Sequence, residues 1–334
     1  MNPVQTVLPW QQTVWAQLRA RHPRWPHALL LSGASGTGKR HFAGVLVAWL
    51  LCAQREEDRA CGECSSCQWL QAGTHPAFYR LSPQTDAKGR TSKVIKIDQV
   101  RELQGFVQQT QSHWRVVLVD PAERLNPAAA NALLKTLEEP GEQVLFVLVS
   151  DQLMQLPATV RSRVQRIELG RVDASAAQAH VQAQLGVDEA TAQRLLRVSA
   201  GAPLRAMALH QGPLWALRAV WLADWQRLLQ SPRQIWDLSA AWQKKLPVQD
   251  FFELLSWMVH DVLALKLQQP VWQDDLSWGD LPDRFSVPQL VQLQGLAAQC
   301  APLLAQNVQE ALVYDSVLQQ LRPAAAAEVV LHGG

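Results

Sequence analysis

Three short, continuously apolar runs in the first half of the chain predict the central strands of a parallel sheet. They cover residues 28–31, 116–119 and 145–149, and each ends at a glycine-rich turn or at a polar residue. A strand that is apolar at every position is buried on both faces, as in a parallel sheet with helices on each side. The pattern therefore predicts an α/β domain over residues 1–167.

Helical patterns occupy the segments between these runs and the rest of the chain. Asn126 can cap a helix, and Pro127 suits its first position. Beyond the α/β domain the strand signals end, and segments such as 251–267 carry apolar residues at helical spacing. We therefore expect a small helical lid at 168–208 and an all-α C-terminal domain at 209–334.

The composition is that of a globular protein with little net charge. Of the 334 residues, 48% are hydrophobic and 18% are charged, and the formal net charge is +2. No overall basic field attracts nucleic acid, so any contact with DNA must be local or made through partners. No apolar run approaches the roughly 20 residues of a membrane helix, and the N-terminus lacks the features of a secretory signal. We therefore expect a cytoplasmic protein that contacts no membrane.

Residues 33–40 follow a predicted strand and precede a helix, which is the context of a phosphate-binding P-loop. In such a loop, backbone N–H groups face the phosphates and a lysine, here Lys39, supplies charge. The next position normally carries Ser or Thr to hold Mg²⁺, and Arg40 has no acceptor for a metal. The sequence leaves open whether the loop binds ATP or ADP or is a vestigial turn. The candidate nucleotide-binding residues are Gly33, Ser35, Gly36, Thr37, Gly38, Lys39 and Arg40.

The second half of an NTPase site belongs at the end of the next central strand, where an Asp supports the metal and a Glu orients water. Asp120 is present there, but Pro121 stands at the position of the Glu. Glu123 is an alternative base, although we expect its spacing to turn it away from the site. Together, Arg40 and Pro121 predict no Mg²⁺-dependent turnover.

Four of the five cysteines form the pattern C-x8-C-x2-C-x2-C, at Cys52, Cys61, Cys64 and Cys67. Disulfides are rare in the cytoplasm, whereas four thiolates satisfy tetrahedral Zn²⁺ and two-residue spacings let one loop present them. A closed site of this kind is structural, because no coordination position is left for a substrate. The alternative is four unrelated buried or free thiols.

Arg161 and Arg163 follow the last strand that the sequence predicts. Arginines outside a sheet edge are usually solvated or ion-paired. Arginine is also the side chain that stabilises phosphate during transfer on a neighbouring subunit, with a rate effect of roughly 10³–10⁵. From the residues alone, both interpretations of Arg163 stay open.

The order of these motifs resembles that of bacterial clamp-loader proteins of the AAA+ class, which serve DNA polymerase III. The motifs are GASGTGK, the four cysteines, VVLVDPAERL, NALLKTLEEP at 131–140 and RSR at 161–163. The resemblance runs from about residue 8 to the C-terminus, and NALLKTLEEP is its most distinctive part. It implies a AAA+ α/β domain, a helical lid and a helical collar that joins five subunits.

The resemblance also implies roles for single residues. The ATP-hydrolysing members carry an intact P-loop and an acidic pair at the second motif, so Arg40 and Pro121 make this chain resemble a non-hydrolysing stator subunit. The Ser-Arg-Cys motif of the family appears as Ser162-Arg163-Val164, which implies that Arg163 is an arginine finger acting on a neighbour's ATP. Ser150 matches the first sensor position and Arg205 the second.

The implied partners are the motor (tau/gamma) and delta subunits of a five-subunit complex, with the sliding clamp and primed DNA reached mainly through that complex. One alternative is an ATP-hydrolysing motor subunit, but Ser or Thr at position 40 and Glu at position 121 are absent. Another is a zinc-bearing nucleic-acid binding protein. The loop that carries the cysteines contains two arginines but four acidic residues. Because acidic side chains repel phosphate, this loop is a poor match for a nucleic-acid backbone.

Overall fold

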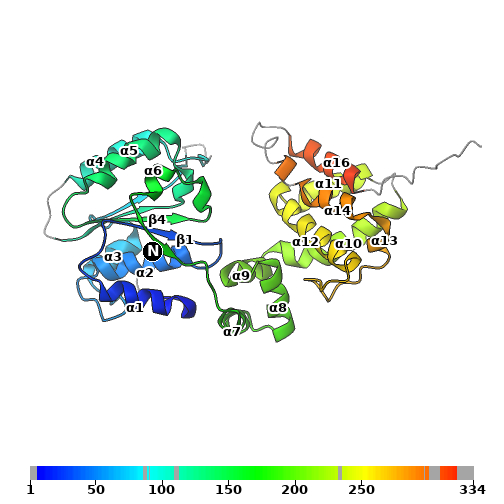
Figure 1. The fold of residues 1–334 in the computed structure, drawn as a ribbon, viewed down its shortest axis with the longest axis horizontal. Coiled ribbons are helices and arrows are strands. Elements are labelled where there is room, and N and C mark those ends of the chain that lie inside the picture. Colours follow the sequence, from blue (N-terminus) through cyan, green and yellow to red (C-terminus); the bar gives the residue numbers. More distant parts are fainter. Residues whose placement is uncertain are drawn as a thin grey trace, which may run out of the picture. The chain divides into compact units, whose positions relative to one another are not determined.

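The computed structural model describes residues 6–85, 89, 91–108, 113–231, 235–296, 298–300 and 309–321. The chain forms two compact units, Met1–Ala183 with Gly201–Arg205 and Gln184–Ala200 with Ala206–Gly334 (Figure 1). The three-part division at 167 and 208 stays a prediction. Within the described residues, every helix is too short or too polar to cross a membrane.

The first unit is built on a parallel sheet that has five strands in the described part of the chain, in the order β2-β3-β4-β1-β5. Every residue of β1, β3 and β4 is buried, which confirms the prediction from the three apolar runs. The strands are β1 (Ala28–Ser32), β2 (Phe78–Leu81), β3 (Arg115–Val119), β4 (Val144–Ser150) and β5 (Gln165–Glu168).

Helices cover both faces of the sheet, as Figure 1 shows. One core lies between the sheet and α1, α2 and α3, and it takes Leu29 and Leu31 from β1. The other lies between the sheet and α4, α5 and α6, and it takes Ala28 and Leu30. Alternate residues of a strand point to opposite faces, so both faces must be apolar. The helices are α1 (Gln12–Ala20), α2 (Lys39–Leu51), α3 (Ser65–Ala72), α4 (Ile97–Val107), α5 (Pro127–Glu138) and α6 (Ala158–Arg161).

The edge strands were not predicted. β2 and β5 have four residues each, and several of their side chains are partly or fully exposed, so neither gives a continuous apolar run. The expectation that Arg163 follows the last strand is therefore wrong, because β5 begins two residues after it. The predicted start of α5 is confirmed: the Asn126 side chain accepts a hydrogen bond from the N–H of Ala129 at 2.7 Å, and Pro127 is the first helical residue.

The second unit is helical in the residues described, as predicted. Within it, α12 packs against α10, α13, α14 and α16. Its core is aromatic: Trp221 contacts the rings of Trp242 and Phe251, and the Tyr314 hydroxyl donates to the carbonyl of Leu246 at 2.6 Å. The later helices of the chain are α7 (Ala174–Leu185), α8 (Glu189–Val198), α9 (Pro203–Gln211), α10 (Pro213–Gln230), α11 (Ile235–Lys245), α12 (Val248–Lys266), α13 (Leu281–Arg284), α14 (Val287–Gln294) and α16 (Glu310–Gln320).

Ion pairs join α8 and α10 to the segment that follows α12. Arg194 Nε lies 2.5 Å from Asp274 Oδ1, and Arg218 Nη1 donates to Asp275 Oδ1 at 2.7 Å. The hydrogen bond from Arg194 holds the pKa of Asp274 below its usual value, and the one from Arg218 does the same for Asp275. A carboxyl group whose pKa is lowered by folding stabilises the fold above its unfolded pKa, and this contribution is lost as the pH falls through the folded pKa.

We expect Asp275→Asn to reduce the acid sensitivity of the second unit. Between about pH 5 and pH 2, the free energy of unfolding should fall by about 1 kcal/mol more for the wild type than for the variant. The reason is that protonation breaks this ion pair, which only the wild type contains. Denaturant unfolding across that pH range measures the difference. Asp283→Asn, at an exposed aspartate of the same unit, is the control. Equal pH profiles for wild type and Asp275→Asn would contradict the prediction.

Candidate functional site

The predicted P-loop connects the end of β1 to the start of α2, in the strand–turn–helix context that such a loop requires. Gly36 and Gly38 have φ angles of 82° and 91°, in the left-handed region that favours glycine. A Cβ atom on Gly36 would lie 2.5 Å from the Cβ of Arg205, so this position also lacks room for a side chain. The turn thus depends on glycine in both conformation and packing.

Two other segments hold the carbonyl groups of the loop. The indole N–H of Trp10 donates to the carbonyl of Thr37 at 2.9 Å, and the Gln11 amide donates to the carbonyl of Gly38 at 3.0 Å. The backbone N–H of Leu204 donates to the carbonyl of Gly36 at 3.0 Å. Sequence reasoning missed these contacts, because their partners lie 26 or more residues away along the chain.

Lys39 is satisfied by its own chain. Its side chain is 1% exposed, and its ammonium group lies 2.6 Å from Asp151 Oδ1 and 2.5 Å from the carbonyl oxygen of Ala34. Asp151 directly follows β4, at the same carboxyl edge of the sheet as the P-loop. The sequence could have indicated Asp151, since an acidic residue after a central strand is well placed for this edge.

Arg40 lies between two carboxylates. Its Nε is 2.9 Å from Asp120 Oδ1, and its Nη1 donates to Asp151 Oδ2 at 3.0 Å. Asp120 follows β3 and is 5% exposed, and its other oxygen lies 3.4 Å from Nη2 of Arg80 on β2. We call the series Lys39, Asp151, Arg40, Asp120 and Arg80 the strand-end ion chain. It holds three cationic and two anionic side chains.

Burial and ion pairing act against each other on the two aspartates. Burial raises the pKa of Asp120 above its usual value, although Arg40 and Arg80 act in the opposite direction. Burial also acts to raise the pKa of Asp151, but Lys39 and Arg40 outweigh it and the pKa is lowered. Of the two aspartates, Asp151 is therefore the one held more firmly in its charged form.

Glu123 lies closer to this edge than expected. The 3₁₀ turn Ala122–Arg124 follows Pro121, and Glu123 Oε1 accepts a hydrogen bond from the backbone N–H of Asp151 at 3.2 Å. The expectation that Glu123 turns away is therefore wrong. One of its carboxylate oxygens is thus engaged by the chain at the end of β4, and the other is buried without a hydrogen-bond partner among the described residues.

The two predicted sensor residues also lie near the P-loop. Ser150 is the buried last residue of β4 and pairs in register with Ser32 of β1. Its hydroxyl accepts a hydrogen bond from the N–H of Gln152 at 3.2 Å. Arg205 lies beside Gly36. Their roles as sensors stay predictions.

Arg163 lies in the turn after α6 and is ion-paired within its own chain. Its Nε donates to Glu138 Oε1 at 2.7 Å, and its Nη1 donates to the carbonyl of Thr159 at 2.9 Å. The Arg163 side chain is still 35% exposed. Glu138 is the last residue of α5, and its partnership with a residue 25 positions away has no signal in the local sequence. Arg163 is thus oriented by α5 and stays partly exposed.

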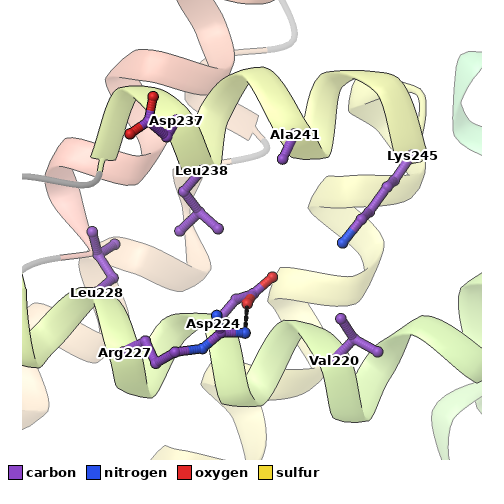
Figure 2. Close-up of a pocket in the computed structure, with 8 residues that line it drawn as sticks. All are labelled: Val220, Asp224, Arg227, Leu228, Asp237, Leu238, Ala241 and Lys245. Atoms are coloured by element: carbon purple, nitrogen blue, oxygen red, sulfur yellow. Dashed lines mark hydrogen bonds and ion pairs between the residues drawn. The ribbon is translucent and has the colours of Figure 1, made fainter.

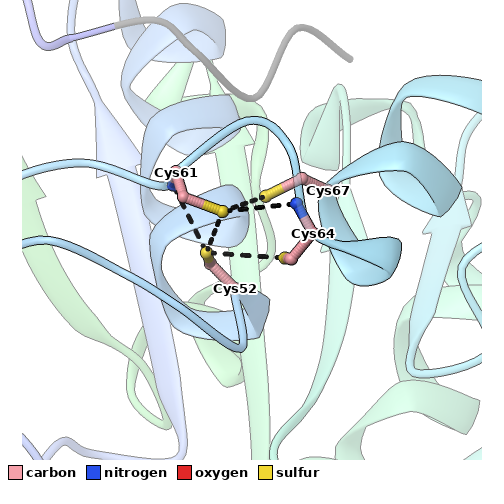
Figure 3. A group of neighbouring side chains, drawn as sticks. All are labelled: Cys52, Cys61, Cys64 and Cys67. Carbon is pink, nitrogen blue, oxygen red and sulfur yellow. Dashed lines mark hydrogen bonds between the residues drawn. The ribbon is translucent and has the colours of Figure 1, made fainter.

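The four predicted cysteine ligands converge (Figure 3). Cys52 follows α2, Cys64 directly precedes α3, Cys67 lies in the first turn of α3, and Cys61 lies in the loop between the two helices. All four sulfur atoms lie within 4.8 Å of one another. A tetrahedral metal with bonds of about 2.3 Å to sulfur has S–S edges of about 3.8 Å, close to the 3.5, 3.8 and 4.0 Å found between neighbouring thiols. The cluster could therefore hold a metal ion.

Backbone groups reinforce this cluster. The N–H of Cys61 donates to Cys52 Sγ at 3.3 Å, and the N–H of Cys64 donates to Cys61 Sγ at 3.4 Å. Such bonds stabilise negative charge on sulfur, the form in which a thiol binds metal. Within the described residues, these cysteines are the one group of three or more potential ligands that comes together.

The second unit has a surface pocket of about 470 Å³ between α10 and α11 (Figure 2). Asp224 in its wall is buried, pairs with Arg227, and accepts a hydrogen bond from the Trp242 indole at 2.9 Å. The ammonium group of Lys245 lies 4.6 Å from the Trp242 ring centroid. These charged groups therefore have partners within the unit.

Comparison with known proteins gives consistent matches. The model of the family described as DNA polymerase III, delta subunit, matches residues 10–173. DNA polymerase III subunit delta' of Pseudomonas aeruginosa is 40% identical over 241 residues, 71% of each chain. The subunit delta' of Escherichia coli K12 is 31% identical over 316 residues, which cover 92% of this chain and 86% of that protein.

A solved structure supports the fold. The crystal structure of a DNA polymerase III gamma subunit-related protein from Thermotoga maritima is similar with a TM-score of 0.51. The match covers 92% of this chain and 98% of that one, at 17% sequence identity. At this identity the likeness shows the architecture alone, namely a parallel sheet flanked by helices with a helical C-terminal part.

Proposed function

The chain belongs to the DNA polymerase III subunit delta' family, and from this premise we propose that it is the non-hydrolysing stator of a clamp loader. It works in a five-subunit complex with motor (tau/gamma) and delta subunits, which loads the sliding clamp onto primed DNA. The observation that carries the non-hydrolysing role is the pairing of Arg40 with both Asp120 and Asp151.

Hydrolysis at a P-loop needs a metal ion and a group that orients the attacking water. Arg40 stands where a hydroxyl would hold the metal, and its guanidinium is paired with the carboxylate of Asp120 that would support it. Pro121 carries no carboxylate, and Glu123 binds the backbone of Asp151. The metal-binding hydroxyl and the acidic residue after Asp120 are thus both replaced, and Asp120 itself is paired with arginine.

Arg163 is the residue through which the chain contributes to catalysis on a neighbour. A guanidinium is always charged and presents five donors in a planar fork. Glu138 and the carbonyl of Thr159 fix its orientation, and the side chain stays partly exposed, so a phosphate of the neighbouring subunit can reach it. An arginine supplied in trans stabilises the charge that develops on the transferred phosphoryl group.

The metal of the cysteine cluster is Zn²⁺, with a structural role. Four thiolates with these separations suit its tetrahedral geometry and fill all of its coordination positions. The ion joins the end of α2 to the start of α3. The alternative of a nucleic-acid binding loop finds little support, because Arg55 lies over the Trp49 ring at 4.4 Å and Arg59 is paired with Glu56 at 2.7 Å.

We expect the purified chain to contain about one zinc per molecule, because a closed site of four cysteines binds this ion tightly. Elemental analysis of protein prepared under reducing, chelator-free conditions provides the measurement. Cys61→Ser should lose the metal, while Cys300→Ala should keep it, since Cys300 lies in the other unit. Wild-type protein without zinc would refute the assignment.

The isolated chain should release phosphate from ATP at the background rate, with or without clamp and primed DNA, because it lacks both the metal-binding hydroxyl and the acidic residue after Asp120. Steady-state phosphate release is the measurement. Turnover that disappears in the Lys39→Ala variant would show that this P-loop is catalytic after all.

Arg163→Ala should assemble into the complex normally, because its side chain lies at the surface, but it should lower clamp loading by at least about tenfold. DNA-stimulated ATP hydrolysis and clamp loading by the reconstituted complex are the measurements. Arg163→Lys should rescue only in part, since lysine keeps the charge and loses the planar fork. Arg161→Ala, which removes the same charge two residues away, is the matched control. Assembled Arg163→Ala complexes that load clamps at the unmodified rate would rule out the finger.

A further inference from the structure

The P-loop fold implies a divalent metal, but the residues present do not fit one. Such a site supplies a hydroxyl from the residue after the P-loop lysine and a carboxylate from the end of the next strand. Here the first is Arg40, and both oxygens of Asp120 face arginines, at 2.9 Å for Arg40 and 3.4 Å for Arg80. Asp120, Glu123 and Asp151 do not form a group of converging metal ligands in the described residues.

We propose that the guanidinium group of Arg40 takes the place of the divalent metal. Replacing Arg40 by a residue with a hydroxyl group would then turn this loop into a Mg²⁺-dependent nucleotide site. The inference rests on the proposed non-hydrolysing function and deepens it. It attributes the loss of metal binding to the one side chain that occupies the metal position, and not to a general loss of the P-loop structure.

The charge balance requires a cation at this position. Asp120 is 5% exposed, and a buried carboxylate without a counter-ion is strongly unfavourable. Arg80 alone does not provide it, because its side chain is 55% exposed and its contact with Asp120 is longer. The planar guanidinium of Arg40 contacts Asp120 through Nε and Asp151 through Nη1. One rigid group is therefore the counter-ion of the carboxylates that follow two strands.

Lys39 is held by the same arrangement. The lysine that faces phosphate in an occupied P-loop is here paired with Asp151, and Asp151 is shared with Arg40. A nucleotide must therefore displace an ion pair in which both partners are mostly buried. Since the metal position is already filled by a cation, Mg²⁺ cannot help the polyphosphate to make this exchange.

The test is a calorimetric titration of the full chain with ATP, once with Mg²⁺ and once with EDTA. For the wild type, we expect either no binding or a Kd that Mg²⁺ changes by less than about twofold. For Arg40→Thr, Mg²⁺ should tighten ATP binding by at least about tenfold, because the variant removes the cation and supplies a hydroxyl. Circular dichroism establishes that each variant is folded, and Arg40→Ser replaces Arg40→Thr if the latter is not.

Arg80→Thr is the matched control. It removes the other arginine at Asp120 but places no hydroxyl after the P-loop lysine, so it should behave as the wild type. Three results would overturn the proposal: wild-type binding that Mg²⁺ tightens tenfold, a folded Arg40→Thr chain without a Mg²⁺ effect, or the same gain in Arg80→Thr.

A pull-down with motor and delta subunits separates this proposal from the clamp-loader function. Failure of the wild-type chain to enter the complex would refute the proposed function, whatever the titrations give. Normal assembly together with a Mg²⁺-dependent wild-type site would refute the role of Arg40 and leave membership of the complex intact.

Discussion

The pairing of Arg40 with Asp120 and Asp151 is the interaction that organises the carboxyl edge of the sheet in the first unit. It joins the start of α2 to the ends of β3 and β4, and Lys39 and Arg80 extend the same chain of charges. In a nucleotide-driven protein, this edge changes when phosphate and metal enter or leave. Here each carboxylate is paired with cations of the same chain, so the edge is held together without a ligand. That property suits a subunit that holds its neighbours in position.

The most distinctive sequence motif also positions Arg163. Residues 131–140 contain Leu133 and Leu137, which are fully buried against the sheet and anchor α5. Glu138 lies at the acidic end of the motif, and its carboxylate contacts both Nε and Nη2 of Arg163. The apolar part of the motif thus fixes the helix, and its last residues orient the arginine. A side chain whose conformation is set in advance loses less entropy on binding, which supports the role proposed for Arg163.

The sequence was most informative where a single local pattern determines the structure. The central strands followed from unbroken apolar runs, the P-loop from its glycine spacing, and the thiol cluster from two-residue intervals between cysteines. The edge strands escaped because a short, half-exposed strand has no such pattern. The orientation of Glu123 escaped because it depends on a 3₁₀ turn, and the Glu138–Arg163 pair because its partners are distant in sequence.

The helix that follows the P-loop combines these constraints. α2 begins at Lys39, within the strand-end ion chain, and it ends at Leu51, directly before the first residue of the thiol cluster. Between these ends, residues 42–50 are all buried in the core beneath the sheet. Any shift of α2 along its axis would disturb the ion chain at one end, the cysteines at the other and the packing between them. None of these three restraints involves a nucleotide, so the position of α2 is set by side chains of the chain itself.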